Sequence, residues 1–143
     1  MIRILVSNAH PRYRRRRAPV RSLVRSVLGD RRRGEIGVVF VNDSAMRSLN
    51  VKYLNHRYPT DVLSFPLSPP GSSLLEGELY INLDQARRQA AEYGVSLNNE
   101  VSRLVIHGLL HLLGYEDRTK AGKTRMTSAE DKWLTVIAKE GQG

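Results

Sequence analysis

The chain contains no cysteine, so it can form neither a disulfide framework nor a thiolate metal site. Any metal ion must therefore be held by histidine, aspartate or glutamate. Long hydrophobic runs are also missing. No stretch approaches the roughly 18 apolar residues of a membrane helix, and the first six residues are too short a run for a signal peptide. We therefore expect a cytoplasmic protein.

The length sets the number of domains. With 143 residues and 41% hydrophobic content, the chain is long enough for one compact domain with its own core and too short for two ordinary ones. Neither an internal repeat nor a linker divides it. We expect a single domain over residues 1–143.

Strand and helix patterns alternate along the chain. A β-α-β opening is predicted at 2–41, because Pro19 at a helix start and Gly29 at its end bracket a helix between two β-branched segments. The run Thr127-Ser128-Ala129-Glu130 forms a capping box, which predicts that a closing helix starts there. Further strands are expected at 61–65 and 78–82, and helix caps at Asp43 or Ser44, at Asp84 and within 96–99.

The net charge of +9 is unevenly distributed. Residues 1–34 carry eleven arginines and one acid, which gives +10, whereas residues 35–143 carry twelve basic and thirteen acidic residues, which gives −1. In the basic helix, Arg17, Arg21 and Arg25 recur at helical spacing opposite an apolar side. The stripe is either a solvated helix face or a phosphate-binding surface, because guanidinium groups match phosphate oxygens and release counterions.

Two histidines, His107 and His111, stand four residues apart on a largely apolar helical segment. One helical turn places both imidazoles on the same face, where they can reach one ion. Gly114 permits a left-handed turn, after which the carboxylate of Asp117 can supply a third ligand. Three protein ligands leave one tetrahedral position open, which is typical of catalytic zinc.

A metalloprotease helix of the type His-Glu-x-x-His is the obvious competitor. Its general base is the glutamate after the first histidine, and Gly108 occupies that position here. A protease of this type would lack its base. We interpret Gly108 as a tight helix contact rather than a substrate residue.

The same residues resemble a known family, the YbeY endoribonucleases or rRNA maturation factors. Residues 107–117 read His-Gly-Leu-Leu-His-Leu-Leu-Gly-Tyr-Glu-Asp and residues 59–66 read Pro-Thr-Asp-Val-Leu-Ser-Phe-Pro. The second motif matches the family's hallmark in full, and the first matches except at its last two places, where the family has Asp and a third histidine and this chain has Glu116 and Asp117. Aspartate is a legitimate zinc ligand, but its charge weakens the Lewis acidity of the ion or alters the metal preference.

The resemblance runs from about residue 36 to the C terminus and implies both a fold and a function. The expected fold is α+β, with a mixed β-sheet, surrounding helices and a metal site at the end of a central helix. The expected function is zinc-dependent endonucleolytic cleavage of single-stranded RNA, in maturation of the small-subunit rRNA 3′ end and in ribosome quality control. The family's RNA-binding arginine after Tyr53 is absent, so its role passes to Arg57, while Asp61 and Ser64 are expected to orient strand and loop.

Two other functions remain open. A ribosome-assembly factor could bind RNA and ribosomal or assembly-factor proteins with a structural metal, closed by Glu116 as a fourth ligand. A metallohydrolase for a small substrate would explain the metal ligands but not the arginines. For the nuclease, the sequence leaves open whether water or the ribose 2′-hydroxyl attacks phosphorus.

Overall fold

A four-stranded mixed β-sheet forms the centre of the computed structural model, which describes residues 1–29, 32–54, 60–69 and 71–142. The strand order is β1-β2-β4-β3. The four predicted strands are confirmed, although the last one starts four residues earlier than expected. Strands β1 (Ile2–Asn8), β2 (Arg33–Val41) and β4 (Leu74–Asn82) are parallel, and β3 (Val62–Pro66) pairs antiparallel with β4 at one edge.

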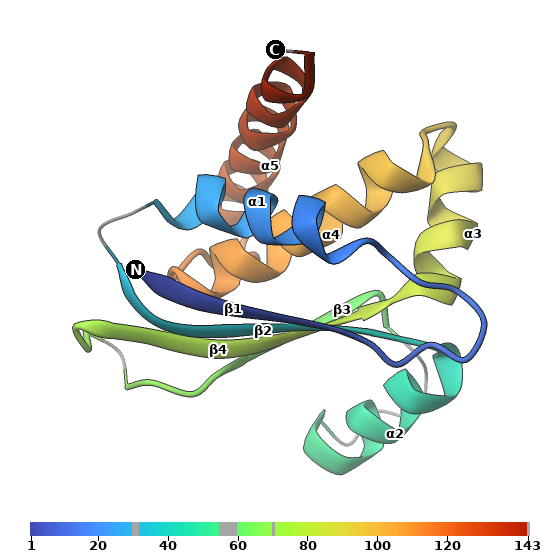
Figure 1. Cartoon of the computed structure of the whole chain (residues 1–143), viewed down its shortest axis with the longest axis horizontal. Helices are drawn as coiled ribbons and strands as arrows, with labels where there is room; N and C mark the ends of the chain where they lie inside the picture. The colour runs from blue at the N-terminus through green and yellow to red at the C-terminus, as the bar shows by residue number, and fades with distance from the viewer. Residues whose placement is uncertain (30–31, 55–59, 70, 143) are drawn as a thin grey trace.

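Five helices surround the sheet in the described part of the chain. Figure 1 shows four of them on one side and α2 on the other. This arrangement confirms the predicted single-domain α+β fold. None of the described helices is long and apolar enough to cross a membrane. The helices are α1 (Arg17–Leu28), α2 (Asp43–Leu54), α3 (Leu83–Tyr93), α4 (Leu97–Leu112) and α5 (Lys120–Gln142).

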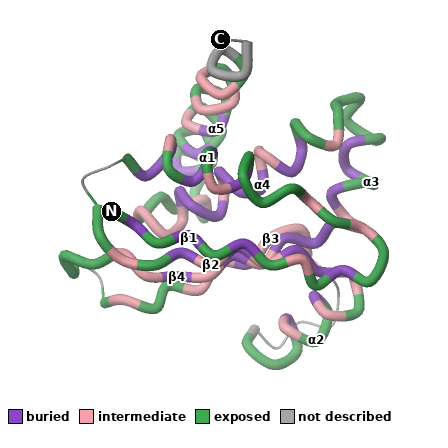
Figure 2. Tube along the Cα trace, in the orientation of Figure 1, coloured by how far each residue is buried: buried purple, intermediate pink, exposed green. Residues whose placement is uncertain are grey.

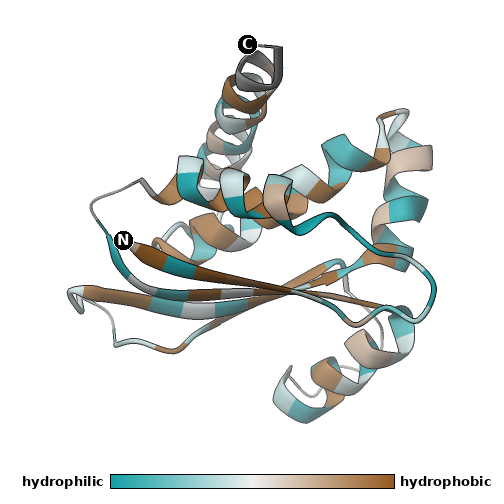
Figure 3. Cartoon of the chain, viewed as in Figure 1, coloured by the Kyte–Doolittle hydropathy of each residue, from teal (hydrophilic) through white to brown (hydrophobic). Residues whose placement is uncertain are grey.

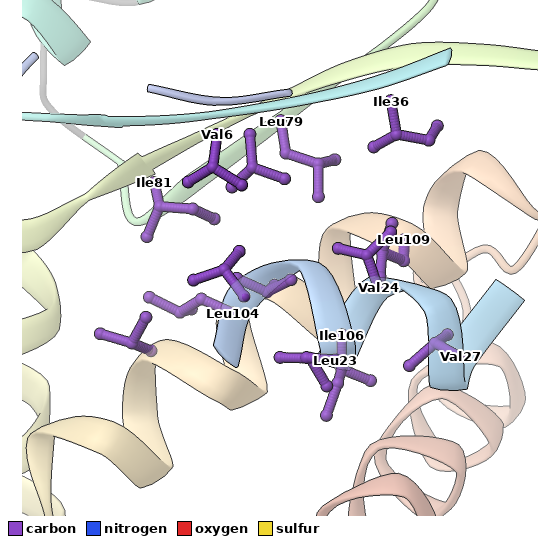
Figure 4. Packing of buried hydrophobic residues seen from close by; sticks show 14 of the residues in the cluster. Val6, Leu23, Val24, Val27, Ile36, Leu79, Ile81, Leu104, Ile106 and Leu109 are labelled. Carbon is purple, nitrogen blue, oxygen red and sulfur yellow. The ribbon is translucent and has the colours of Figure 1, made fainter. Parts of the chain in front are cut away.

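The main core lies between the sheet and helices α1 and α4. Alternating side chains of the strands point into it, because successive residues of a strand face opposite sides of the sheet. Ile36 and Leu79 on the strands meet Val24 of α1 and Leu109 of α4, and all four side chains are fully buried (Figure 4). Figure 2 shows buried stretches on the strands and on the helices that cover this face of the sheet. This core fixes α4 above β3 and β4.

A smaller core lies under α2 on the opposite face of the sheet. Met46 of α2 packs there against Val41 and Leu63. The rest of this face carries exposed or half-buried side chains, among them Leu5 and Glu35. Colouring by hydropathy shows apolar strands at the centre and hydrophilic residues recurring along α1 (Figure 3).

Three predicted helix starts are corrected by the structure. Asn82, and not Asp84, caps α3, since its Oδ1 accepts hydrogen bonds from the amides of residues 84 and 85. Asn42 Oδ1 likewise accepts the amide of Ala45 at the start of α2. Asn42 directly follows β2 and Asn82 ends β4, and the extended backbone at Asn82 suits a cap. Ser96, within the predicted window, caps α4.

The third correction concerns the closing helix. It begins at Lys120, where Thr119 Oγ1 accepts the amide of Gly122 at 2.9 Å. The capping-box motif at 127–130 therefore lies inside α5, and the prediction of a helix start there is wrong. The Glu130 side chain does not cap the start of a helix. Its carboxylate is engaged by side chains of α4 instead.

Candidate metal centre

Helix α4 lies very close to strands β3 and β4, and glycines make this possible. A Cβ atom on Gly108 would lie 2.8 Å from Leu79 Cδ2 and 3.2 Å from Ser64 Oγ. The Ser64 hydroxyl donates to the carbonyl of Gly108 at 3.1 Å. Gly108 is therefore a tight helix contact, as its sequence position suggested, and Ser64 orients α4 on the sheet. This contact fixes the height of the two histidines above the sheet.

The structure brings His107, His111 and Asp117 together. Their ligand atoms all lie within 4.8 Å of one another. The two Nε2 atoms are 3.1 Å apart, and Asp117 Oδ2 is 3.5 Å from His107 Nε2 and 3.6 Å from His111 Nε2. Ligands about 2.0–2.1 Å from a tetrahedral zinc would be about 3.3 Å apart. The three donors therefore fit one such ion.

Asp117 reaches the histidines because the chain reverses after α4. Gly114 adopts φ 102°, in the region that favours glycine. The amides of Gly114 and Tyr115 donate to the carbonyls of His111 and Leu110, at 3.0 and 2.9 Å. These bonds satisfy the last carbonyls of the helix and turn the chain back. The turn at the end of α4 thus brings Asp117 back to the two histidines of that helix.

The trio is open to solvent on one side. The side chains of His107, His111 and Asp117 are 24%, 31% and 37% exposed. A cavity of about 190 Å³ lies against His111 and Asp117, and Tyr115 and Arg118 also line it. Among the residues that the structure describes, no further histidine, aspartate or glutamate joins the group. A bound ion would keep a position facing this cavity.

His107 is also held from behind by Glu130 of α5. The Nδ1 atom of His107 lies 2.6 Å from Glu130 Oε2. Burial lowers the pKa of His107, but the hydrogen bond and charge of Glu130, with Asp117 and Asp61 adding to them, outweigh it, so the pKa lies above its ordinary value. Because Nδ1 is occupied by Glu130, the Nε2 atom is the one that faces the other two ligands.

The predicted RNA-binding arginines lie elsewhere in the fold. Arg17, Arg21 and Arg25 are on α1, which packs on β1 and α4, whereas the candidate ligands lie near β3 and β4, toward the opposite edge of the sheet. Arg17 Nε donates to the carbonyl of Val6 at 3.0 Å. The structure therefore does not bring the stripe to the metal ligands. Arg57 lies outside the described residues.

Asp61 has the orienting role expected for it. Its Oδ1 accepts the amide of Val62 at 2.7 Å, and its carbonyl accepts the amide of Asn82 at 2.9 Å. Both contacts fix the start of β3 beside β4.

Sequence reasoning missed Glu130 and its partner Arg103. A signal for Glu130 existed: Met126, Glu130 and Ile137 recur at helical spacing on the side of α5 that packs on the core. A carboxylate on an apolar helix face needs a partner, because its burial without one is costly. Because Glu130 was interpreted as part of a capping box, no buried partner was predicted for its carboxylate.

Comparisons with known proteins show which family this chain matches and which solved structure shares its fold. Residues 9–138 match the family model for endoribonuclease YbeY. The chain is 43% identical over 103 residues to an endoribonuclease YbeY of Chloroherpeton thalassium, covering 72% of each protein. It is 39% identical over 130 residues to that of an Anaeromyxobacter species, covering 89% of this chain and 68% of the relative. The solution structure of TM1509 from Thermotoga maritima shares the fold, with a TM-score of 0.63 at 24% identity over 99% of this chain and 92% of that one.

Proposed function

This chain belongs to the YbeY endoribonuclease family, and from that premise we propose that it is a metal-dependent endoribonuclease that cleaves single-stranded RNA. Zinc, or a similar divalent ion, is held by His107, His111 and Asp117. The observation that carries the proposal is the close group of three donor atoms within 4.8 Å, beside an open cavity. The proposed substrate is small-subunit rRNA, in maturation of its 3′ end and in ribosome quality control in the cytoplasm.

The ion would supply Lewis acidity at the scissile phosphate and lower the pKa of water near it. The chain's own residues supply the rest. His107 and His111 present their Nε2 atoms from one helix face, and Asp117 adds a charge opposite them. Arg118 lines the same cavity and places a cation where a phosphate would enter.

The RNA-binding part of the proposal rests on charge. Arg17, Arg21 and Arg25 form the basic stripe of α1, and Arg21 and Arg25 line an open groove on that helix. Such a stripe binds phosphates through counterion release, with no need for base recognition. Arg57 is proposed as a further RNA contact by analogy with the family's arginine in that region.

A non-catalytic assembly factor with a structural metal is the competing function. Structural zinc is normally closed by four protein ligands. In the described part of the chain the group consists of three, and Glu116 is not among them. The open position therefore favours the enzyme.

The test measures metal content and RNA cleavage on the same preparations. Wild-type protein should hold about one divalent ion per chain and cut an unstructured RNA with multiple turnovers, which a chelator stops and added zinc restores. His111→Ala should lose most of the metal and cut far less, while still binding RNA through the intact α1. Asp117→His, which restores the family's usual ligand, should bind the metal at least as well as wild type.

Equal cutting by wild type and His111→Ala would indicate a contaminating nuclease and overturn the catalytic assignment. A metal-loaded protein that binds RNA and never cleaves it would support the assembly factor. DNA of the same sequence reports on the nucleophile, because it resists cleavage if the 2′-hydroxyl takes part.

A further inference from the structure

Glu130 is a buried carboxylate with both oxygens engaged. The residue is 6% exposed and lies on α5, amid apolar side chains. One oxygen, Oε1, accepts from Arg103 Nη1 at 2.9 Å, and the other, Oε2, accepts from His107 Nδ1 at 2.6 Å. Arg103 also donates to Asp131 Oδ1 at 2.8 Å. Burying such a charge is costly unless it is paired, and here it is paired twice.

These contacts form a continuous chain of polar atoms along one face of α4. Arg103, His107 and His111 stand four residues apart and so share that face. The chain runs from the Arg103 guanidinium through the Glu130 carboxylate to His107 Nδ1, and then from His107 Nε2 to His111 Nε2 at 3.1 Å. Arg103 anchors Glu130, and Glu130 in turn contacts the ring nitrogen of His107 that faces away from the proposed metal.

We propose that Glu130 is the positioning residue of His107. By accepting a hydrogen bond from Nδ1–H, it fixes the tautomer and the angle of the imidazole, and so leaves the Nε2 lone pair directed at the ion. Its negative charge also makes Nε2 a stronger donor, as carboxylates behind metal-bound histidines do. The inference rests on the proposed metal site. It assigns to Arg103 the role of holding Glu130 in place.

The experiment measures Zn²⁺ affinity by competition with a chelator, without RNA. Glu130→Gln keeps the size of the side chain and an oxygen acceptor but removes the charge. It should weaken zinc binding by about 10- to 100-fold. Asp131→Asn is the matched control, because it removes the other acidic partner of Arg103 and leaves His107 untouched. Its zinc affinity should stay within about twofold of wild type.

A second readout separates positioning from general damage to the fold. Nitrogen NMR of the metal-free proteins, at a pH where the ring is neutral, reports the tautomer of His107. Wild type and Asp131→Asn should carry the proton on Nδ1, and Glu130→Gln should show a mixture of the two tautomers. Thermal unfolding of the metal-free proteins shows whether Glu130→Gln folds.

The outcomes distinguish this inference from the proposed function. Unchanged zinc affinity in a folded Glu130→Gln, or an unchanged tautomer, overturns the positioning role and leaves the metal site standing. Failure of wild type to bind zinc overturns both. A zinc-binding wild type that never cuts RNA contradicts the nuclease alone, because the positioning of His107 is measured without substrate.

Discussion

At the scale of single residues, His10 is a buried histidine for which the sequence predicted no role. It is 8% exposed, and its Nδ1 accepts the amides of Arg12 and Tyr13 at 3.0 Å. Its Nε2 therefore carries the proton and donates to Asp84 Oδ1 at 2.8 Å. The other oxygen of Asp84 accepts the amide of Asp43 at 2.9 Å. His10 thus ties the arginine-rich segment to the first turn of α3 and, through Asp84, to the start of α2.

The pKa of Asp84 makes this network sensitive to acid. Burial raises the pKa, but the hydrogen bonds from His10 and from the Asp43 amide outweigh it, so the pKa lies below its ordinary value. A carboxylate with a lowered folded pKa stabilises the protein above its unfolded pKa of about 3.9, and the contribution is lost as the pH falls through the folded value.

We predict that Asp84→Asn lowers the free energy of unfolding by about 1–2 kcal/mol at neutral pH, since the neutral amide has one acceptor oxygen for the two donors that the carboxylate accepts from. The difference from wild type should shrink as the pH falls below about 3.9 and through the lower folded pKa of Asp84, because wild type then loses its charge as well. Urea unfolding between pH 3 and 7 measures this. Glu92→Gln, on an exposed position of the same helix, is the control and should change little. A difference that stays constant with pH would contradict the charge argument.

At the scale of elements, α4 depends on a close approach to the sheet at two glycines. A Cβ on Gly108 would press on the fully buried Leu79, and a Cβ on Gly77 of β4 would lie 2.8 Å from Leu112 Cδ2. Both contacts lie beside the metal ligands, one on the helix and one on the sheet. The distance between α4 and the sheet therefore sets the position of His107 and His111.

We predict that Gly108→Ala lowers the free energy of unfolding by about 1 kcal/mol, because overpacking of about 1–3 kcal/mol outweighs the better helix propensity of alanine. It should also weaken zinc binding, since the histidine-bearing turn must move. Gly37→Ala is the control, because its Cβ would meet Glu78 Cγ at an ordinary 3.5 Å.

Chemical denaturation and chelator competition measure the two effects. Combining Gly108→Ala with Leu79→Val should restore part of the loss by making room for the methyl group. A Gly108→Ala protein as stable and as tight for zinc as wild type would show that the close approach is not needed.

The sequence predicted what is local in the chain. His107 and His111 lie on one helical turn, and Asp117 follows after a glycine turn, so their meeting depends on backbone geometry over eleven residues. Glu130 reaches His107 only through the packing of α5 on α4, which no short pattern encodes. The same reasoning explains the misplaced start of α5. A capping box is a local sequence pattern, whereas the contacts of Glu130 with Arg103 and His107 are tertiary. These tertiary contacts, and not the local pattern, determine where the Glu130 side chain lies.

At the scale of the whole molecule, the basic stripe of α1 and the proposed metal ligands occupy different parts of the fold. The stripe on α1 lies over β1, and α4 separates it from β3 at the far edge (Figure 1). An RNA that touches both must pass across or around α4. Binding and cutting are therefore expected to respond to different substitutions.

We predict that replacing Arg17, Arg21 and Arg25 by glutamine flattens the plot of log affinity for single-stranded RNA against log salt, by roughly 0.7 per lost phosphate contact. The control replaces Arg3, Arg47 and Lys52, which removes the same charge from the open sheet face and from α2. Its slope should change less. An unchanged slope in the first variant would mean that the stripe is a solvated face.

The order of the elements along the chain has a consequence for biosynthesis. Every strand that the structure describes lies within residues 2–82, whereas the ligands and Glu130 lie within residues 107–130. A nascent chain emerges N-terminal part first, so the sheet and the basic helix leave the ribosome before the first ligand does. A translation product that stops before α5 would carry the basic surface and both histidines, but His107 would lack its carboxylate partner. On the proposed role of Glu130, such a product would hold the metal ion more weakly than the complete chain, so full metal affinity would be reached only when α5 has been made.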